Sequence, residues 1–166
     1  SLRLDAVPSH KWARAARGVA LLMRLFRRYL VAETDRGVTN DVRMRIIGRR
    51  DRIPAELLRA IHAAEEATRH GKRLDLRIAV DYSARDAMVR AAQHLSGVEE
   101  ITREDLSRAM SGVYHWEGES RDVDLLIRTG GEQRLMDFML CESAYAELHF
   151  TARRSPEVTG CVCGPP

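Results

Sequence analysis

The sequence has little cysteine: three residues in 166, of which Cys161 and Cys163 lie close to the C-terminus. This odd number and spacing exclude the disulfide framework of a small secreted protein, so we expect a reducing, cytoplasmic environment. No apolar run approaches the roughly 20 residues that a membrane-spanning helix needs, and the first residues show no secretion signal. The composition therefore indicates a cytoplasmic protein with one hydrophobic core of ordinary size.

Signatures of nucleotide and nucleic-acid binding are also missing. The sequence contains neither a Gly-Lys-Ser/Thr phosphate loop nor a G-x-G-x-x-G turn. Its 27 basic and 24 acidic residues are well mixed and leave a formal net charge of only +3. That balance does not predict nucleic acid as a partner, although it is compatible with a small anionic ligand.

What the sequence does contain is an alternation of strand and helix patterns. An apolar stripe at helical spacing predicts an amphipathic helix over residues 17–34. Strands are predicted at 1–7, 42–48, 74–80, 123–127 and 147–150, and further helices at 54–70, 83–95, 102–110 and from about Gln133. Because parallel neighbours need crossover connections, this order predicts an α/β fold with a largely parallel sheet flanked by helices.

The pattern stops after Thr151, where proline, glycine and cysteine collect without periodicity. We therefore predict one domain over residues 1–151 and a disordered tail over residues 152–166. Because the first residue is Ser1 and a strand pattern already starts there, we also expect the chain to begin partway into a longer protein.

The candidate site lies in DVDLLIRTGGEQR, residues 122–134. Ligands of α/β sheets bind beyond the carboxyl ends of strands, where Arg128, Gly130 and Gly131 are predicted. The glycines would let backbone amides approach a phosphate, the following helix would point its N-terminus at it, and Arg128 and Arg134 would supply two bidentate cations, as a diphosphate requires. Alternatively, the glycines only form a turn and the arginines pair with Glu132, Asp137 or another surface carboxylate. The residues alone leave these two interpretations equal.

A longer segment, DVDLLIRTGGEQRLMDFMLCESAYAELHF at 122–150, resembles the signature of cis-prenyltransferases of the undecaprenyl diphosphate synthase type. That signature reads D-L-x-I-R-T-G-G-E, then R-x-S-N-F, then A-Y-A-E. Weaker similarity continues upstream in the family's order, at KWARAARGVALLMRLF, MRIIG and DYSARDAMVRAA. The resemblance covers nearly all of residues 6–151 and implies an incomplete undecaprenyl diphosphate synthase-like fold.

The resemblance implies a transferase that condenses isopentenyl diphosphate with an allylic diphosphate, using Mg²⁺, to make a polyprenyl diphosphate with cis double bonds. The positions that match substrate-binding residues of the family are Arg128, Arg134, Trp12, Arg14, Gly130 and Gly131. Glu147 matches an acidic residue near the metal. Without the resemblance, Trp12 would be interpreted as a buried anchor beside a helix start and Glu147 as a solvated strand end.

The family also implies a homodimer for the full-length protein. A basic helix face with Arg24, Arg27 and Arg28 is compatible with peripheral contact to an anionic membrane, although we interpret it as an ordinary solvated face. Cys141 and His149, with the two C-terminal cysteines, are the one conceivable zinc cluster, and we interpret their spacing as chance.

The sequence departs from the family pattern at several positions. Met136 replaces the hydroxyl residue of R-x-S-N-F, which removes a hydrogen bond to phosphate worth roughly 1.5–3 kcal/mol. Asp137 replaces its asparagine and would repel a phosphate. Cys141 stands where the family usually has tryptophan, and Lys11 where it often has asparagine.

The largest departure concerns the family's N-terminal D-G-N-G-R-W type motif, whose aspartate binds Mg²⁺ and is central to activity. These 166 residues contain no counterpart to it, so we assign no catalytic residue in the chain and expect little or no activity from it alone. The alternative function is a non-catalytic diphosphate-binding relative, or a partner subunit of an active prenyltransferase. We attribute the tail after Thr151 to a shift of reading frame.

Overall fold

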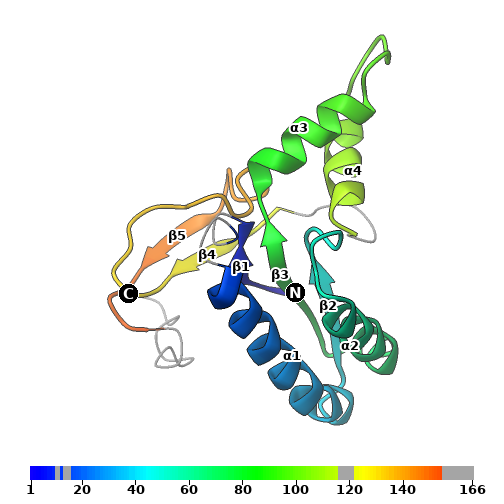
Figure 1. The fold of residues 1–166 in the computed structure, drawn as a ribbon. Helices are drawn as coiled ribbons and strands as arrows, with labels where there is room; N and C mark the ends of the chain where they lie inside the picture. The colour runs from blue at the N-terminus through cyan, green and yellow to red at the C-terminus, as the bar shows by residue number, and fades with distance from the viewer. Residues whose placement is uncertain (10–11, 13–15, 116–121, 155–166) are drawn as a thin grey trace. The chain divides into compact units, whose positions relative to one another are not determined.

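The computed structural model describes residues 1–9, 12, 16–115 and 122–154, which belong to two compact units, Ser1–Glu119 and Ser120–Pro166. The elements of the first unit are β1 (Leu2–Pro8), α1 (Ala16–Thr39), β2 (Val42–Ile47), α2 (Ala55–Ala67), β3 (Leu74–Tyr82), α3 (Ala84–His94) and α4 (Arg103–Val113). The second unit contains β4 (Leu125–Arg128) and β5 (Glu147–Phe150) (Figure 1). The boundary between the units falls inside the segment predicted as one domain, and residues 155–166 of the predicted tail lie outside the described residues.

The strands of the first unit form a three-stranded parallel sheet in the order β1-β3-β2. Ile78 of the central strand lies opposite Leu4 of β1 on one side and Ile46 of β2 on the other. Each crossover between neighbouring strands contains a helix, as parallel pairing requires. The α/β fold with a parallel sheet and flanking helices is confirmed.

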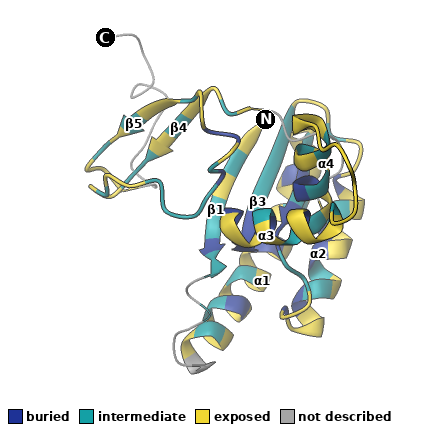
Figure 2. Ribbon diagram, turned by 90° about the horizontal axis from the view of Figure 1, so that it is seen from above, coloured by how far each residue is buried: buried dark blue, intermediate teal, exposed yellow. Residues whose placement is uncertain are grey.

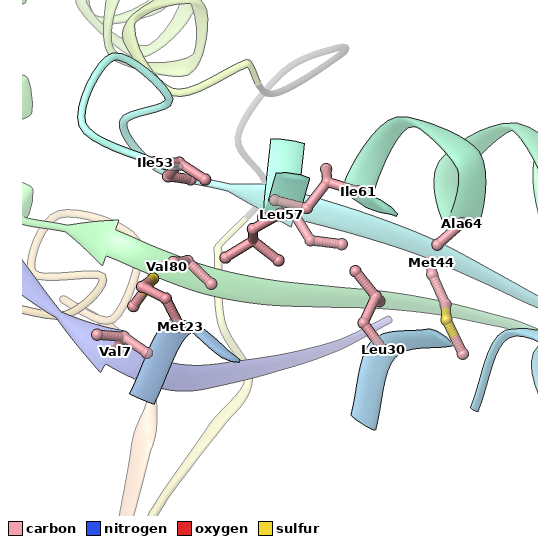
Figure 3. Close-up of a cluster of buried hydrophobic side chains, with 10 residues drawn as sticks. Val7, Met23, Leu30, Met44, Ile53, Leu57, Ile61, Ala64 and Val80 are labelled. Atoms are coloured by element: carbon pink, nitrogen blue, oxygen red, sulfur yellow. The ribbon is translucent and has the colours of Figure 1, made fainter. Parts of the chain in front are cut away.

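Helices α1 and α2 cover one face of this sheet and form the core with it. The centre of the core consists of Met23 and Leu30 from α1, Leu57 and Ile61 from α2, and side chains from all three strands (Figure 3). Ile61 is fully buried between the helix and the sheet. Burying an aliphatic side chain of this size stabilises the fold by about 1.5–3 kcal/mol, so these contacts fix the helices on the sheet.

The helix boundaries follow the capping signals of the sequence. Ser83 accepts a hydrogen bond from the Asp86 amide at 3.0 Å and begins α3, while Thr102 and Asp105 form a reciprocal capping box at α4. The first helix is longer than predicted and runs to Thr39. None of the helices in the described ranges combines the length and the hydropathy that a bilayer crossing requires.

The opposite face of the sheet carries charge. Arg77 in β3 lies opposite Arg3 of β1 and Arg45 of β2, so three arginines form one row across the strands. Asp75 forms an ion pair with Arg45 Nε at 3.1 Å and accepts a hydrogen bond from Arg77 Nε at 2.8 Å. Burial lowers the pKa of the Arg77 guanidinium, and the bond to Asp75 opposes that change. Asp75 therefore compensates two adjacent cations that are largely removed from water.

We expect Asp75→Asn to lower the free energy of unfolding by about 2 kcal/mol, because it leaves Arg45 and Arg77 side by side without their shared anion. Urea unfolding followed by circular dichroism measures this loss. The matched control is Asp35→Asn on the exposed surface of α1, which should change stability by less than about 0.5 kcal/mol. Equal stability of the two variants would show that the arginine row needs no compensation.

The second unit is a two-stranded parallel sheet. Leu125 to Arg128 of β4 lie opposite Glu147 to Phe150 of β5, which confirms the two predicted strands. The pairing continues beyond the strand ends, since the Thr151 amide donates to the Arg128 carbonyl at 2.9 Å. Residues 151–153 are thereby fixed next to the loop that follows β4.

The helix predicted from Gln133 is wrong. Residues 132–135 are irregular and residues 136–145 form a series of turns. Met136 and Met139 have φ angles of 59° and 50°, in the left-handed region that a right-handed helix cannot contain. Met139 is fully buried, and Ser143 bonds back to its carbonyl oxygen through both its amide and its hydroxyl. The segment therefore forms a turn around a buried methionine, although its local sequence pattern favoured a helix.

Candidate functional site

The loop after β4 is the centre of the candidate site. Arg128 is the last residue of the strand, and Gly130 and Gly131 follow with φ angles of 81° and 77°. These left-handed angles suit glycine, which has no Cβ to clash. A Cβ at either glycine would meet no atom within 4 Å, so the space beside the loop is open. The conformation thus presents a bare backbone next to the arginine.

The amides of this loop are not available in the way the sequence suggested. Gly130 donates its N–H to the Arg153 carbonyl at 2.8 Å, and Gly131 donates to the Thr151 carbonyl at 3.0 Å. The segment that follows the loop, residues 132–145, contains no helix, so it does not point a helix N-terminus at the loop. The backbone therefore shapes this loop, and the positive charge comes from side chains.

Arg128 is one of several described residues with a shielded polar atom that has no hydrogen-bond partner, and it is the one that ends β4. Its side chain is half-buried, and its Nε is shielded from solvent without a hydrogen-bond partner among the described residues. A buried guanidinium nitrogen without an acceptor is costly, and an oxyanion is the acceptor that its planar fork fits best. The residue is positioned by the last backbone pairing of β4 with β5.

Arg134 has a different environment. Its exposed side chain pairs with Glu132, with 2.7 Å between Arg134 Nε and Glu132 Oε2. This is the surface pairing that the alternative interpretation of the sequence predicted for one of the two arginines. The pair leaves Arg134 less positive toward a ligand than Arg128, although an exposed ion pair is weak enough to exchange partners.

Glu147 is separated from the loop along the strands. It is exposed at the beginning of β5, opposite Leu125, whereas Arg128 pairs with Phe150 at the other end. Three residues of strand separate the two ends by roughly 10 Å. The described residues contain no group of three or more carboxylate, histidine or cysteine side chains that could hold a metal ion. Of the conceivable zinc cluster, the two C-terminal cysteines lie outside the described residues.

Trp12 belongs to the first unit, and its interpretation as a hydrophobic anchor agrees with its environment. It is partly buried against the core of that unit, and the Arg52 guanidinium carbon lies 5.1 Å from its ring centroid. This distance is within the range of a cation–π interaction. Arg14 and Lys11 lie outside the described residues.

The sequence analysis did not predict the ion pair between Arg52 and Asp81. Asp81, at the carboxyl end of β3, is 0% exposed and receives two hydrogen bonds from the Arg52 fork, one of them from Nε to Oδ2 at 2.9 Å. Its φ of 54° is left-handed, and its carbonyl accepts the Arg49 amide at 3.2 Å. A carboxylate directly after the apolar run IAV was the available signal. Buried charge, unusual backbone and the end of a parallel strand coincide at this residue.

Parallel strands joined by crossover helices define an α/β protein, and the cationic loop after β4 is its candidate anion site. A family model described as "Putative undecaprenyl diphosphate synthase" matches residues 4–161. The chain is 52% identical over 157 residues to isoprenyl transferase 1 of Bradyrhizobium diazoefficiens. The aligned residues make up 95% of this chain and 62% of that relative. The chain belongs to the undecaprenyl diphosphate synthase family of isoprenyl transferases.

Solved structures agree with this assignment. A probable undecaprenyl diphosphate synthase from Campylobacter jejuni matches with a TM-score of 0.83 and 30% identity, over 95% of this chain and 73% of that one. A second match is lavandulyl diphosphate synthase from Lavandula x intermedia in complex with dimethylallyl diphosphate. Its TM-score is 0.86 and its identity 27%, and the match covers 96% of this chain and 71% of that one. The chain thus spans less than two thirds of its curated relative's length and under three quarters of each structure.

Proposed function

We propose that the chain is part of a cis-prenyltransferase, which condenses isopentenyl diphosphate with an allylic diphosphate to make a polyprenyl diphosphate. The observation that carries this proposal is Arg128, a half-buried cation at the end of β4 with a shielded nitrogen that lacks an acceptor among the described residues. A diphosphate supplies the oxygens such a group needs. The family membership and the allylic diphosphate bound by the lavender relative support the same ligand class.

Within this proposal the residues have unequal roles. Arg128 holds a phosphate of isopentenyl diphosphate, and Gly130 and Gly131 keep the neighbouring space free of side chains. Arg134 binds the same diphosphate after it breaks its ion pair with Glu132. Trp12 and Arg14 are proposed as substrate-binding residues because they match such positions of the family. Met136 supplies no hydroxyl to a phosphate, so binding is weaker than the family pattern would give.

Mg²⁺ is the cofactor that the family implies, and the described residues offer little to it. Glu147 supplies a single carboxylate, at the far end of β5 from Arg128. Mg²⁺ is commonly held by one or two carboxylates together with substrate phosphates, and when bound it would neutralise diphosphate charge. We propose Glu147 as one ligand at most. For the full-length protein we propose a homodimer in the cytoplasm.

Replacing Arg128 by alanine tests the phosphate site. We expect isopentenyl diphosphate to bind roughly 10- to 100-fold more weakly, because a hydrogen-bonded charge contributes about 1.5–3 kcal/mol. Isothermal titration calorimetry measures this affinity. Arg134→Ala should cause a smaller loss, and Arg103→Ala, on the exposed start of α4, none. Unchanged affinity in Arg128→Ala would refute the site.

Catalysis by the chain alone is a separate matter. Its residues include no D-G-N-G-R-W type motif, and we propose that it elongates poorly by itself and acts as a diphosphate-binding piece or partner subunit. Incubation with farnesyl diphosphate, labelled isopentenyl diphosphate and Mg²⁺, followed by extraction of labelled polyprenyl products, measures this. Robust elongation would overturn the prediction of low activity while leaving the phosphate site intact.

A further inference from the structure

The carboxyl ends of the three strands of the first unit are linked by one chain of side-chain contacts. Asp81 is the last but one residue of β3, Arg52 lies between β2 and α2, and Trp12 lies between β1 and α1. Parallel strands end at the same edge of a sheet, and ligands of α/β proteins bind beyond that edge. The three residues therefore meet where this fold places a substrate site.

The first contact of this chain joins Asp81 to Arg52. Both oxygens of the Asp81 carboxylate accept hydrogen bonds from the guanidinium, with Nε donating to Oδ2 at 2.9 Å. The carboxylate cannot move to meet the arginine, because residues 79–82 at the end of β3 are all buried, whereas residues 74–78 are only partly buried (Figure 2). A bidentate pair with a buried carboxylate fixes both the position and the plane of the arginine head group.

The second contact joins Arg52 to Trp12. The guanidinium carbon lies 5.1 Å from the centroid of the indole ring, within the range of a cation–π interaction. Trp12 packs against the core, and its Nε1 is shielded from solvent without a hydrogen-bond partner among the described residues. The orientation of the ring therefore depends on apolar packing and on the guanidinium that Asp81 holds.

We propose that Asp81 and Arg52 are positioning residues, which fix the indole of Trp12 in the orientation that binds an allylic diphosphate. This inference rests on the proposed function, in which Trp12 is a substrate-binding residue. An indole offers apolar surface that suits the hydrocarbon part of such a substrate. The left-handed φ of 54° at Asp81 supports the inference, because unfavourable backbone conformations cluster where a function requires them.

Binding of farnesyl diphosphate to the full chain tests the proposal, with Trp12 emission recorded in a Trp116→Phe background. We expect Asp81→Asn to shift this emission and to weaken binding roughly tenfold, because asparagine holds the guanidinium less firmly than a carboxylate does. The variant should still fold, since 38% of the Arg52 side chain is exposed and its charge can reach water. Tighter binding would overturn the proposal, because it would show that Arg52, once released by Asp81, binds the diphosphate itself.

The conservative variant Arg52→Lys separates positioning from charge compensation. Lysine keeps a cation beside Asp81 but lacks the planar fork that meets the carboxylate and the ring together. We expect circular dichroism to show that the fold is retained, while farnesyl diphosphate binds more weakly and the Trp12 emission shifts. Unchanged binding and emission would overturn the proposal, because a cation alone would then be sufficient.

Asp51→Asn is the matched control. Asp51 forms a similar pair with Arg49 in the same loop, with 2.9 Å between Arg49 Nε and Asp51 Oδ1. The same chemical change at this exposed carboxylate should leave both the Trp12 emission and the affinity for farnesyl diphosphate unchanged. An effect as large as that of Asp81→Asn would overturn the proposal, because loss of any anion in the loop would then have the same result.

Parallel titrations with isopentenyl diphosphate separate this inference from the proposed function. A parent chain that binds isopentenyl diphosphate but not farnesyl diphosphate would overturn the positioning role and leave the phosphate site at Arg128 intact. Equal affinity of the parent and Asp81→Asn for farnesyl diphosphate would also overturn the positioning role alone. Absence of binding to either diphosphate would refute the proposed function, and this inference with it.

Discussion

Gly48→Ala is expected to lower the free energy of unfolding by about 4 kcal/mol, the largest effect of any single substitution predicted for this protein. Gly48 follows β2 with a φ of 121°, a conformation that side chains rarely adopt. A Cβ at this position would lie 2.0 Å from the Val80 carbonyl oxygen, which belongs to the backbone of the central strand and cannot rotate away. Relief of this overlap would require β2 and β3 to separate.

Denaturant unfolding of the Gly48→Ala variant measures the effect, and Gly112→Ala provides the control. Gly112 lies in α4, where a Cβ would meet nothing within 4 Å. The same change there should leave stability unaltered or raise it by up to about 1 kcal/mol, since alanine favours the helix. If Gly48→Ala were as stable as Gly112→Ala, the close approach of β2 to β3 would be disproved.

Arg52→Met is expected to destabilise the first unit by about 3 kcal/mol, because it leaves the Asp81 carboxylate buried without its cation. Asp81 is fully buried, whereas 38% of the Arg52 side chain is exposed, so the cost arises mainly from the stranded anion. Methionine keeps most of the apolar contact of the arginine stem. The substitution also removes the cation from the face of Trp12.

The double variant Arg52→Met with Asp81→Asn separates charge from packing. It removes both charges, so we expect it to recover more than half of the lost stability, as replacement of a whole buried pair often does. Trp12 fluorescence provides a second measurement in a Trp116→Phe background, because the chain has only two tryptophans. Both variants should change the Trp12 emission, since both lose the stacked guanidinium. A double variant no more stable than Arg52→Met would attribute the loss to packing.

The strands and most helices were predictable because their signals are local. Alternating and continuous apolar runs predicted β2, β3, β4 and β5, and the caps at Ser83 and Thr102 placed the starts of α3 and α4. The prediction of a helix from Gln133 was wrong, and the reason is not local to the sequence. Two methionines there adopt left-handed angles, and one of them is fully buried within its unit.

The candidate site divides in the same way. The position of Arg128 and the two glycines after a strand followed from the sequence, because a strand end and its turn are consecutive in the chain. The sequence did not predict that the amides of Gly130 and Gly131 are already hydrogen-bonded. Their acceptors are the carbonyls of Arg153 and Thr151, which come from a later part of the chain. The Asp81–Arg52 pair did not follow either: the position of Asp81 after an apolar run marked it as a candidate buried carboxylate, but its partner lies 29 residues away in the sequence.

By itself, then, the sequence determined the α/β class, the family and the loop that carries Arg128, because each rests on consecutive residues or short periodic patterns. The tertiary structure alone decided which groups meet there. It paired the amides of Gly130 and Gly131 with backbone carbonyls, paired Arg134 with Glu132, and separated Glu147 from Arg128 along the strands. The physical reason is that hydrogen bonds, ion pairs and burial depend on distance in space, which the periodicity of one segment does not encode.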